Sequence, residues 1–167
     1  MILILKGQRY CLTGMSAMKH KALFLDRDGV INEAAPRGEY VCSVDGFCMR
    51  KGIVDLICRA RKMGYLVVVV TNQRGVNLGR MSHDDLENIH AHMKNNLAQK
   101  GAVIDAVYAC THGLDDACDC RKPKPGMLLA AARDFNIDLA SSIMIGDTPS
   151  DVEAGKSAGC HTHLLTI

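Results

Sequence analysis

Four carboxylates in two distant segments have the type and spacing that metal-assisted chemistry needs. Asp26 and Asp28 flank a single residue, and Asp147 and Asp151 lie together much further along the chain. Carboxylates that are brought close together repel, so they must take up protons or bind a hard cation. Magnesium prefers oxygen ligands and commonly combines one or two carboxylates with a substrate phosphate. We therefore expect a magnesium site at these four residues.

Two further side chains supply groups that suit phosphate oxygens. Thr71 offers a hydroxyl and Lys122 offers an ammonium. A carboxylate nucleophile, a metal ion, a hydroxyl and a lysine together describe the transfer of a phosphoryl group to an aspartate. Aspartate and glycine are also common in ordinary turns. Four polar clusters that each follow a separate predicted strand are, however, hard to explain by turn chemistry.

Three cysteines and one histidine form a compact segment at Cys110, His112, Cys118 and Cys120. Three thiolates and an imidazole make a closed tetrahedral zinc site, which indicates a structural metal. One alternative is a pair of disulfides, which the short spacing of Cys118 and Cys120 disfavours. The other is a chance cluster of buried thiols, which the polar residues in between disfavour. The other cysteines are expected to pack as small apolar side chains: Cys11, Cys42, Cys48, Cys58 and Cys160.

The elements that must position these groups alternate between strands and helices. Apolar and β-branched runs predict strands at 21–26, 65–70, 106–109, 142–146 and 162–165. Helical spacing and capping residues predict helices at 52–63, 82–100, 126–135 and 152–158. This alternation is typical of an α/β fold with a central parallel sheet between two layers of helices. Ligands bind beyond the carboxyl ends of such strands, so the polar clusters would meet at one edge of the sheet.

Length and composition limit the classes of protein that are possible. The chain has 167 residues, 48% of them hydrophobic, which is enough for one domain with a sizeable core. We expect an N-terminal extension of unknown role at 1–20 and one domain at 21–167. The net charge of +2 gives no reason to expect a nucleic-acid or membrane partner. Eight cysteines without a signal peptide indicate a reducing compartment, so we expect a cytoplasmic protein, and a monomer.

Four motifs resemble those of a known family. They are DRDGVIN at 26–32, TNQ at 71–73, KPKP at 122–125 and GDTPSD at 146–151. Their order, their separation and their placement after predicted strands resemble the haloacid dehalogenase (HAD) superfamily of phosphatases. The resemblance spans residues 26–151 and implies a Rossmann-like, three-layer α/β/α fold.

The resemblance assigns catalytic roles to four residues. Asp26 would be the nucleophile that forms an aspartyl-phosphate, and Asp28 would protonate the leaving alcohol and later activate water. Thr71 would hold oxygens of the transferring phosphoryl group, and Lys122 would pair with the nucleophile and the phosphate. The residues expected to bind substrate are Asn72, Gln73, Arg74 and Arg121. Asn72 and Gln73 could instead only order the turn, and Arg74 could simply be solvated.

The same resemblance assigns the magnesium ligands. Asp147 would bind the ion together with the carboxylate of Asp26 and the backbone carbonyl of Asp28. Asp151 would support the metal directly or through water. The alternative for Asp151 is an acid at the N-terminus of a helix, where the helix dipole favours it.

The cysteine segment indicates which subgroup of the superfamily the chain resembles. A C-x-H and C-x-C loop that runs into CRKPKPGM at 120–127 is similar to the HAD subgroup of heptose bisphosphate phosphatases and histidinol phosphatases. In that subgroup a zinc loop stands in place of a large cap domain. The resemblance therefore implies no large cap, a zinc ion that stiffens the loop, and a guanidinium at Arg121 that can grip phosphate.

The resemblance also implies a small phosphorylated sugar as substrate. Val30 after DRDG, and PGM at 125–127, favour a heptose 1,7-bisphosphate that loses its C7 phosphate in heptose precursor biosynthesis. Histidinol phosphate, or another small phosphomonoester, is the alternative. Thr148 departs from the pattern, because heptose phosphatases often carry lysine there.

Two other classes of function fit less well. A polynucleotide 3′-phosphatase would need a basic groove and stacking aromatics, but the net charge is +2 and aromatic residues make up 4%. A non-catalytic zinc module would have no need of the carboxylates.

Arg27 is expected to steer an anionic substrate or to be solvated. Three histidines of one predicted helix are expected to be surface or core residues away from the site: His83, His90 and His92.

Overall fold

The computed structural model describes residues 18–166. The predicted N-terminal extension lies almost wholly outside this range, so its boundary at residue 20 stays a prediction. His20 is already part of the fold, because it forms a β-bridge with Ile137. Its backbone amide also donates to the carbonyl of Asn136.

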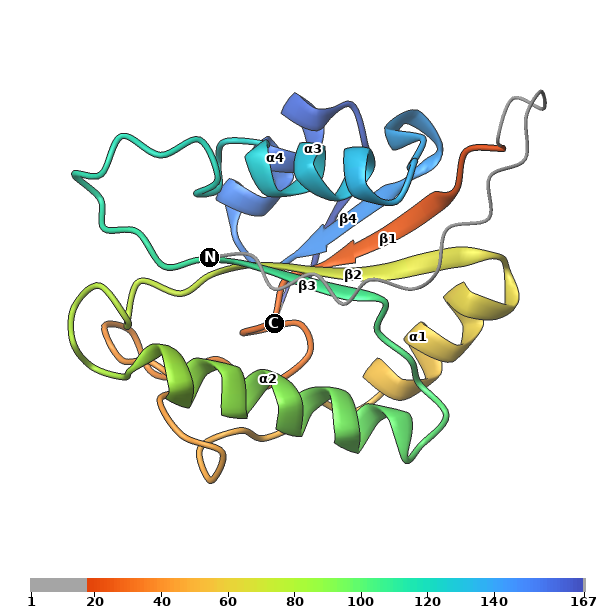
Figure 1. Cartoon of the computed structure of the whole chain (residues 1–167). Coiled ribbons are helices and arrows are strands. Elements are labelled where there is room, and N and C mark those ends of the chain that lie inside the picture. Colours follow the sequence, from red (N-terminus) through yellow and green to blue (C-terminus); the bar gives the residue numbers. More distant parts are fainter. Residues whose placement is uncertain (1–17, 167) are drawn as a thin grey trace.

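Five parallel strands form one sheet in the order β3-β2-β1-β4-β5 (Figure 1). The strands are β1 (Lys21–Leu25), β2 (Tyr65–Asn72), β3 (Ala106–Cys110), β4 (Ile143–Gly146) and β5 (His161–Leu164). The chain first builds outward from β1 through β2 to β3 and then crosses back to β4. The central strand β1 and its neighbour β4 therefore flank the point at which the direction of winding reverses. In open α/β sheets this point is where ligands bind.

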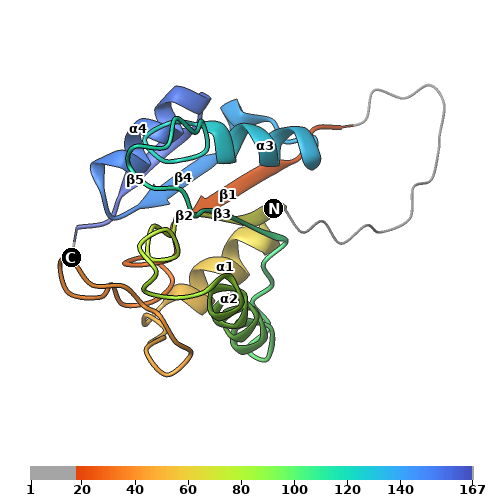
Figure 2. The ribbon, with the colours of Figure 1, turned by 60° about the vertical axis from the view of Figure 1, so that its left-hand side comes forward.

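Four helices cover the two faces of the sheet. They are α1 (Ile53–Lys62), α2 (His83–Ala98), α3 (Gly126–Asp134) and α4 (Pro149–Ala158). Figures 1 and 2 show α1 and α2 against one face and α3 and α4 against the other. The predicted three-layer α/β/α fold with a parallel sheet is confirmed. A short 3-10 helix at Leu139–Ser141 was not predicted.

Strand β2 shows why the sheet is apolar throughout. Val67 and Val69 pack into the core on the α1 and α2 side. Val68 and Val70 pack into a second core on the α3 and α4 side. Successive side chains of a strand point to opposite faces, so a strand between two helix layers must be apolar at every position. The strand continues two residues beyond its predicted end, which places Thr71 and Asn72 at its carboxyl end.

The start of α4 was predicted too late, at residue 152. The helix begins at Pro149, with Thr148 as its N-cap and Asp151 closing a reciprocal capping box. Proline is suited to the first helical position because its missing N–H would be unpaired there. The polar GDTPSD motif is therefore the cap and first turn of a helix.

The connections after the strands converge at one edge of the sheet. Figure 1 shows the loop after β2 (yellow-green) and the loop after β3 (teal) at the same edge. Within residues 18–166 no helix is long and apolar enough to span a bilayer. In the long β1–α1 connection, an antiparallel bridge joins Asn32, near its start, to Met49, near its end.

Candidate active site

Asp26 lies directly after β1 and is held by two donors. Its Oδ1 accepts hydrogen bonds from the backbone N–H of Arg27 at 2.7 Å and lies 3.0 Å from Nζ of Lys122. Burial raises the pKa of Asp26 to about 6, although the Lys122 ammonium acts in the opposite direction. Both donors use Oδ1, so Oδ2 is the oxygen that is available for chemistry.

Lys122 is a buried ammonium surrounded by oxygen atoms. Its Nζ donates to the carbonyl of Val70 at 2.7 Å and lies 2.5 Å from Oδ1 of Asp151, in addition to its contact with Asp26. Burial alone would lower the pKa of Lys122, but the two carboxylates outweigh burial and raise it. The lysine is therefore charged, and it compensates buried carboxylates that would otherwise repel each other.

Asn72 fixes the backbone at Lys122. Its Nδ2 donates to the carbonyl of Lys122 at 3.0 Å, and its Oδ1 accepts from the Lys122 N–H at 3.1 Å. Both ends of this amide are thus engaged with the backbone. The structure thus shows Asn72 bonded to the backbone of Lys122, while its predicted contact with substrate stays a prediction.

Three carboxylates form a group that suits a hard cation. Carboxylate oxygens of Asp26, Asp147 and Asp151 lie within 4.8 Å of one another. Burial, and next the charge of Asp151, raise the pKa of Asp147. Oδ1 of Asp147 is buried and has no hydrogen-bond partner among the described residues. An all-oxygen donor set with an unpaired buried oxygen fits magnesium.

The two carboxylate oxygens of Asp151 have separate partners. Oδ2 accepts from the backbone N–H of Thr148 at 3.0 Å and from its hydroxyl at 2.6 Å. Oδ1 faces Lys122. The helix-capping interpretation of Asp151 is thus present in the structure, together with an ion pair that the sequence analysis did not foresee.

Asp28 is held by three side chains. The guanidinium of Arg27 donates to both of its oxygens, from Nη2 at 2.9 Å. Nδ2 of Asn32 donates to Oδ1 at 2.9 Å, and Nε2 of Gln73 donates to Oδ2 at 2.8 Å. Arg27 is fully buried, so the prediction that it is solvated or steers substrate was wrong.

Gln73 also orients Thr71. Both side chains are buried, and Nε2 of Gln73 donates to Oγ1 of Thr71 at 2.8 Å. Because that hydroxyl oxygen already accepts a bond, its own proton is directed elsewhere and can be donated to a phosphoryl oxygen. Gln73 was predicted to bind substrate, and the structure shows it bonded to two site residues.

The two arginines predicted to bind substrate differ in their contacts. Nε of Arg74 is buried and has no hydrogen-bond partner among the described residues. Nη1 of Arg121 donates to the carbonyl of His112 at 3.4 Å. Arg74 therefore has an unused donor beside the carboxyl end of β2, while Arg121 is attached to the cysteine loop.

The cysteine loop brings its four predicted ligands together. Sγ of Cys110 lies 3.8 Å from Sγ of Cys118 and 3.6 Å from Nδ1 of His112. Nδ1 of His112 lies 3.2 Å from Sγ of Cys120. A tetrahedral zinc ion would separate two sulfur ligands by about 3.8 Å, and a sulfur from a nitrogen ligand by about 3.6 Å. No disulfide joins these cysteines, and the arrangement is compatible with a tetrahedral metal.

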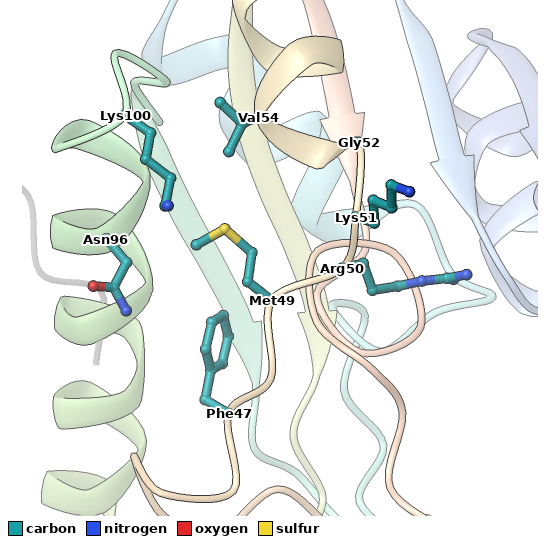
Figure 3. A pocket seen from close by; sticks show the side chains of 8 residues that line it. All are labelled: Phe47, Met49, Arg50, Lys51, Gly52, Val54, Asn96 and Lys100. Atoms are coloured by element: carbon teal, nitrogen blue, oxygen red, sulfur yellow. The ribbon is translucent and has the colours of Figure 1, made fainter.

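A hollow of about 500 Å³ lies away from these groups. It is lined by the start of α1, the end of α2 and residues such as Phe47 and Met49 (Figure 3). Asn96 and Lys100 reach toward it, whereas Arg50 points away (Figure 3). Arg50 instead donates to the carbonyl of Gly29. The hollow contains none of the carboxylates and is not the candidate site.

Gly29 allows Asp147 to approach the turn after β1. Its φ is +83°, a backbone conformation that favours glycine. A Cβ atom at this position would lie 1.9 Å from Oδ2 of Asp147 and 2.4 Å from its Cγ. A side chain at residue 29 would therefore displace the carboxylate from the group of three.

The comparison with characterised sequences identifies the family. The HAD-hydrolase-like family model matches residues 119–166. A protein of Burkholderia mallei named D-glycero-alpha-D-manno-heptose-1,7-bisphosphate 7-phosphatase is 45% identical over 155 residues, covering 89% of this chain and 80% of the relative. The chain belongs to this family of HAD phosphatases. A Helicobacter pylori member, named for the beta anomer, is 41% identical and covers 89% of this chain and 84% of its own length.

Solved structures agree with the HAD phosphatase assignment. The D,D-heptose 1,7-bisphosphate phosphatase of Bordetella bronchiseptica, complexed with magnesium and phosphate, superposes with a TM-score of 0.81 at 40% identity. The match covers 86% of this chain and 79% of that one. A HAD-like phosphatase structure from Mesorhizobium loti gives a TM-score of 0.80 at 32% identity, covering 89% and 74%.

Some residues of the site were missed by sequence reasoning. Asn32 belongs to the DRDGVIN motif but was assigned no role, although it is fully buried and bonds Asp28. His90 was placed away from the site, yet its Nε2 lies 3.3 Å from Nη1 of Arg27. The motif itself was the available signal for Asn32. Nothing in the local sequence of α2 indicated His90.

Comparing Gly29→Ala with Gly38→Ala is expected to distinguish the effect of backbone strain on stability from the effect of the clash with Asp147. The left-handed backbone alone should lower the free energy of unfolding by roughly 1 kcal/mol, and displacing the buried carboxylate should remove about 1–3 kcal/mol more. Gly38 is the matched control, because its φ is +91° with nothing within 4 Å of a Cβ. Urea denaturation of Gly29→Ala and Gly38→Ala measures the difference, and equal losses would contradict the close approach.

Proposed function

We propose that this chain is a magnesium-dependent phosphatase that removes the C7 phosphate of D-glycero-D-manno-heptose 1,7-bisphosphate through an aspartyl-phosphate. The observation that carries the proposal is the contact between Asp26 and Lys122 at 3.0 Å, at the point where the winding of the sheet reverses. Relatives at 40–45% identity that are named for this reaction supply the substrate. The reaction would serve the synthesis of ADP- or GDP-heptose precursors.

Magnesium would be held by Asp26, Asp147 and the backbone carbonyl of Asp28, with Asp151 close by. When bound, such an ion neutralises charge on phosphate oxygens and on the carboxylates around it. The crystal structure of the Bordetella bronchiseptica relative contains magnesium and phosphate, which supports this assignment.

The first chemical step forms a bond between Oδ2 of Asp26 and phosphorus and breaks the bond between phosphorus and the C7 oxygen. Lys122 and the Arg27 N–H hold Oδ1, which directs the other oxygen at the phosphate. Asp28, in its protonated form, gives a proton to the departing C7 oxygen. The hydroxyl of Thr71 donates to the phosphoryl oxygens, because its own oxygen accepts from Gln73.

In the second step Asp28 takes a proton from water as the water attacks phosphorus. The bond between phosphorus and Oδ2 of Asp26 breaks, and inorganic phosphate leaves. Arg27, Asn32 and Gln73 each donate to the carboxylate of Asp28, which holds it in place for both proton transfers. The unpaired Nε of Arg74 and the guanidinium of Arg121 would bind substrate oxygens, including those of the retained C1 phosphate.

We also propose that Cys110, His112, Cys118 and Cys120 bind one structural zinc. The interatomic distances of 3.2 to 3.8 Å support this, because they are close to the edges of a tetrahedral site. Cys110 ends β3, and residues 111–120 form no helix or strand. A closed metal site would therefore supply the order that a core would otherwise give. Thiolate ligands need reducing conditions, which supports a cytoplasmic location, and we propose that the protein is a monomer.

Asp26→Asn should abolish magnesium-dependent release of phosphate, because an amide is not a nucleophile for phosphorus. We expect a loss of at least about 10³-fold in turnover with unchanged folding, as for other removed nucleophiles. Asp45→Asn, at an exposed position, makes the same change of charge away from the site. Phosphate release by either variant is followed with a colorimetric assay. Substantial turnover by Asp26→Asn would refute the catalytic role.

Substrate choice is tested by comparing both anomers of heptose 1,7-bisphosphate with histidinol phosphate under magnesium. We expect heptose bisphosphate to have the higher kcat/KM, and phosphorus NMR of the product to show the C1 phosphate retained. The relatives are named for different anomers, so both are included. A preference for histidinol phosphate would replace the proposed substrate.

Protein prepared without chelator should contain about one zinc per chain. Cys118→Ser should lose this zinc and lower the Tm, because a structural site contributes directly to folding. Cys48→Ser, at an exposed cysteine outside the loop, is the matched control. Elemental analysis and thermal unfolding of both variants give the result, and zinc-free wild-type protein would contradict the assignment.

A further inference from the structure

His90 makes a polar contact with the catalytic turn that the proposed mechanism does not use. It lies on α2, and its Nε2 is 3.3 Å from Nη1 of Arg27. Arg27 follows the nucleophile directly in sequence and has no solvent exposure. The contact therefore joins a helix of one outer layer to the turn that carries Asp26 and Asp28.

The chemistry of arginine fixes the direction of this hydrogen bond. A guanidinium has five N–H donors and no acceptor, so Arg27 donates and Nε2 of His90 accepts. The His90 ring is thus neutral, with its proton on Nδ1. Burial, and next the charge of Arg27, lower the pKa of His90 to about 3, which agrees with a neutral ring.

Arg27 needs this acceptor because it is buried. Its Nε and Nη2 donate to the carboxylate of Asp28 at 2.9 to 3.1 Å. Among the described residues, His90 is the hydrogen-bond partner of Nη1. A buried donor without a partner is unfavourable, because it loses its hydrogen bond to water and gains none in the protein. If His90 were lost, the guanidinium would turn to satisfy Nη1 and would draw Asp28 with it.

We propose that His90 is a positioning residue that sets the orientation of Arg27 and, through it, the carboxylate that exchanges protons with the leaving group and with water. The inference rests on the proposed phosphatase function and adds to it a residue outside the four motifs. Helix α2 thereby contributes to catalysis without touching the substrate. A purely structural His90 would affect folding alone.

A matched pair of substitutions distinguishes these two functions. In His90→Gln, Oε1 is the same number of bonds from Cβ as Nε2 of histidine, so the acceptor is kept. In His90→Asn the oxygen ends one bond short and the acceptor is lost, although both variants remain polar and smaller than histidine. His92→Gln is the control on the same helix, because His92 contacts Asn96 and the ring of Phe47 and not the catalytic turn.

The test compares kcat/KM for two substrates, one whose leaving group needs a proton and one whose leaving group does not. General acid catalysis contributes about 10²- to 10⁴-fold where the leaving alcohol needs a proton, and p-nitrophenolate leaves without one. We expect His90→Asn to lower kcat/KM for the sugar phosphate at least tenfold and to change kcat/KM for p-nitrophenyl phosphate by less than about threefold. His90→Gln and His92→Gln should keep the wild-type ratio of the two values.

Three outcomes would overturn the inference: an equal fall with both substrates, no fall with either, or a changed ratio in His92→Gln. If wild-type protein hydrolyses neither phosphate, the proposed function fails separately. In that case NMR of the arginine side chains still tests the contact. The slowly exchanging Nη1–H signal of Arg27, whose partner is His90, should be lost in His90→Asn and kept in His90→Gln, and its retention in both variants would refute the positioning function.

Discussion

The buried ammonium of Lys122 holds together groups that arrive from three separate strand ends. It contacts Asp26 after β1, the carbonyl of Val70 in β2 and Asp151 in the first turn of α4. Without this positive charge, carboxylates buried side by side would repel each other and the ends of β1 and β4 could not approach. The ion pairs thus stabilise the fold and set the geometry of the site at once.

Much of this arrangement follows from rules that act along the chain. A parallel sheet brings the carboxyl ends of its strands to one edge, so motifs after β1, β2, β3 and β4 must converge. Continuous apolar runs such as that of β2 indicate burial on both faces. The short spacing within the cysteine loop already brings its ligands near one another. Fold class, motif order and the Asp26–Lys122 pairing were therefore accessible from sequence.

The partners of each polar side chain were not accessible in the same way. Arg27 was expected in solvent because charged residues are seldom fully buried. Its burial depends on His90, 63 positions away, and Asp28 depends on Gln73, 45 positions away. Such contacts arise only once the layers have packed. Thr148 shows a related limit: the sequence analysis treated it only as a departure from the family pattern, whereas in the fold it is the N-cap that bonds Asp151.

The chain reaches Lys122 directly from the cysteine loop, since Cys120 lies two residues before it. On the other side, the amide of Asn72 grips the lysine backbone. The backbone of Lys122 is thus held between the end of β2 and the cysteine loop. Were the proposed zinc lost from that loop, one of these two supports would loosen, so the position of a buried ammonium would depend on a metal ion that does not touch it.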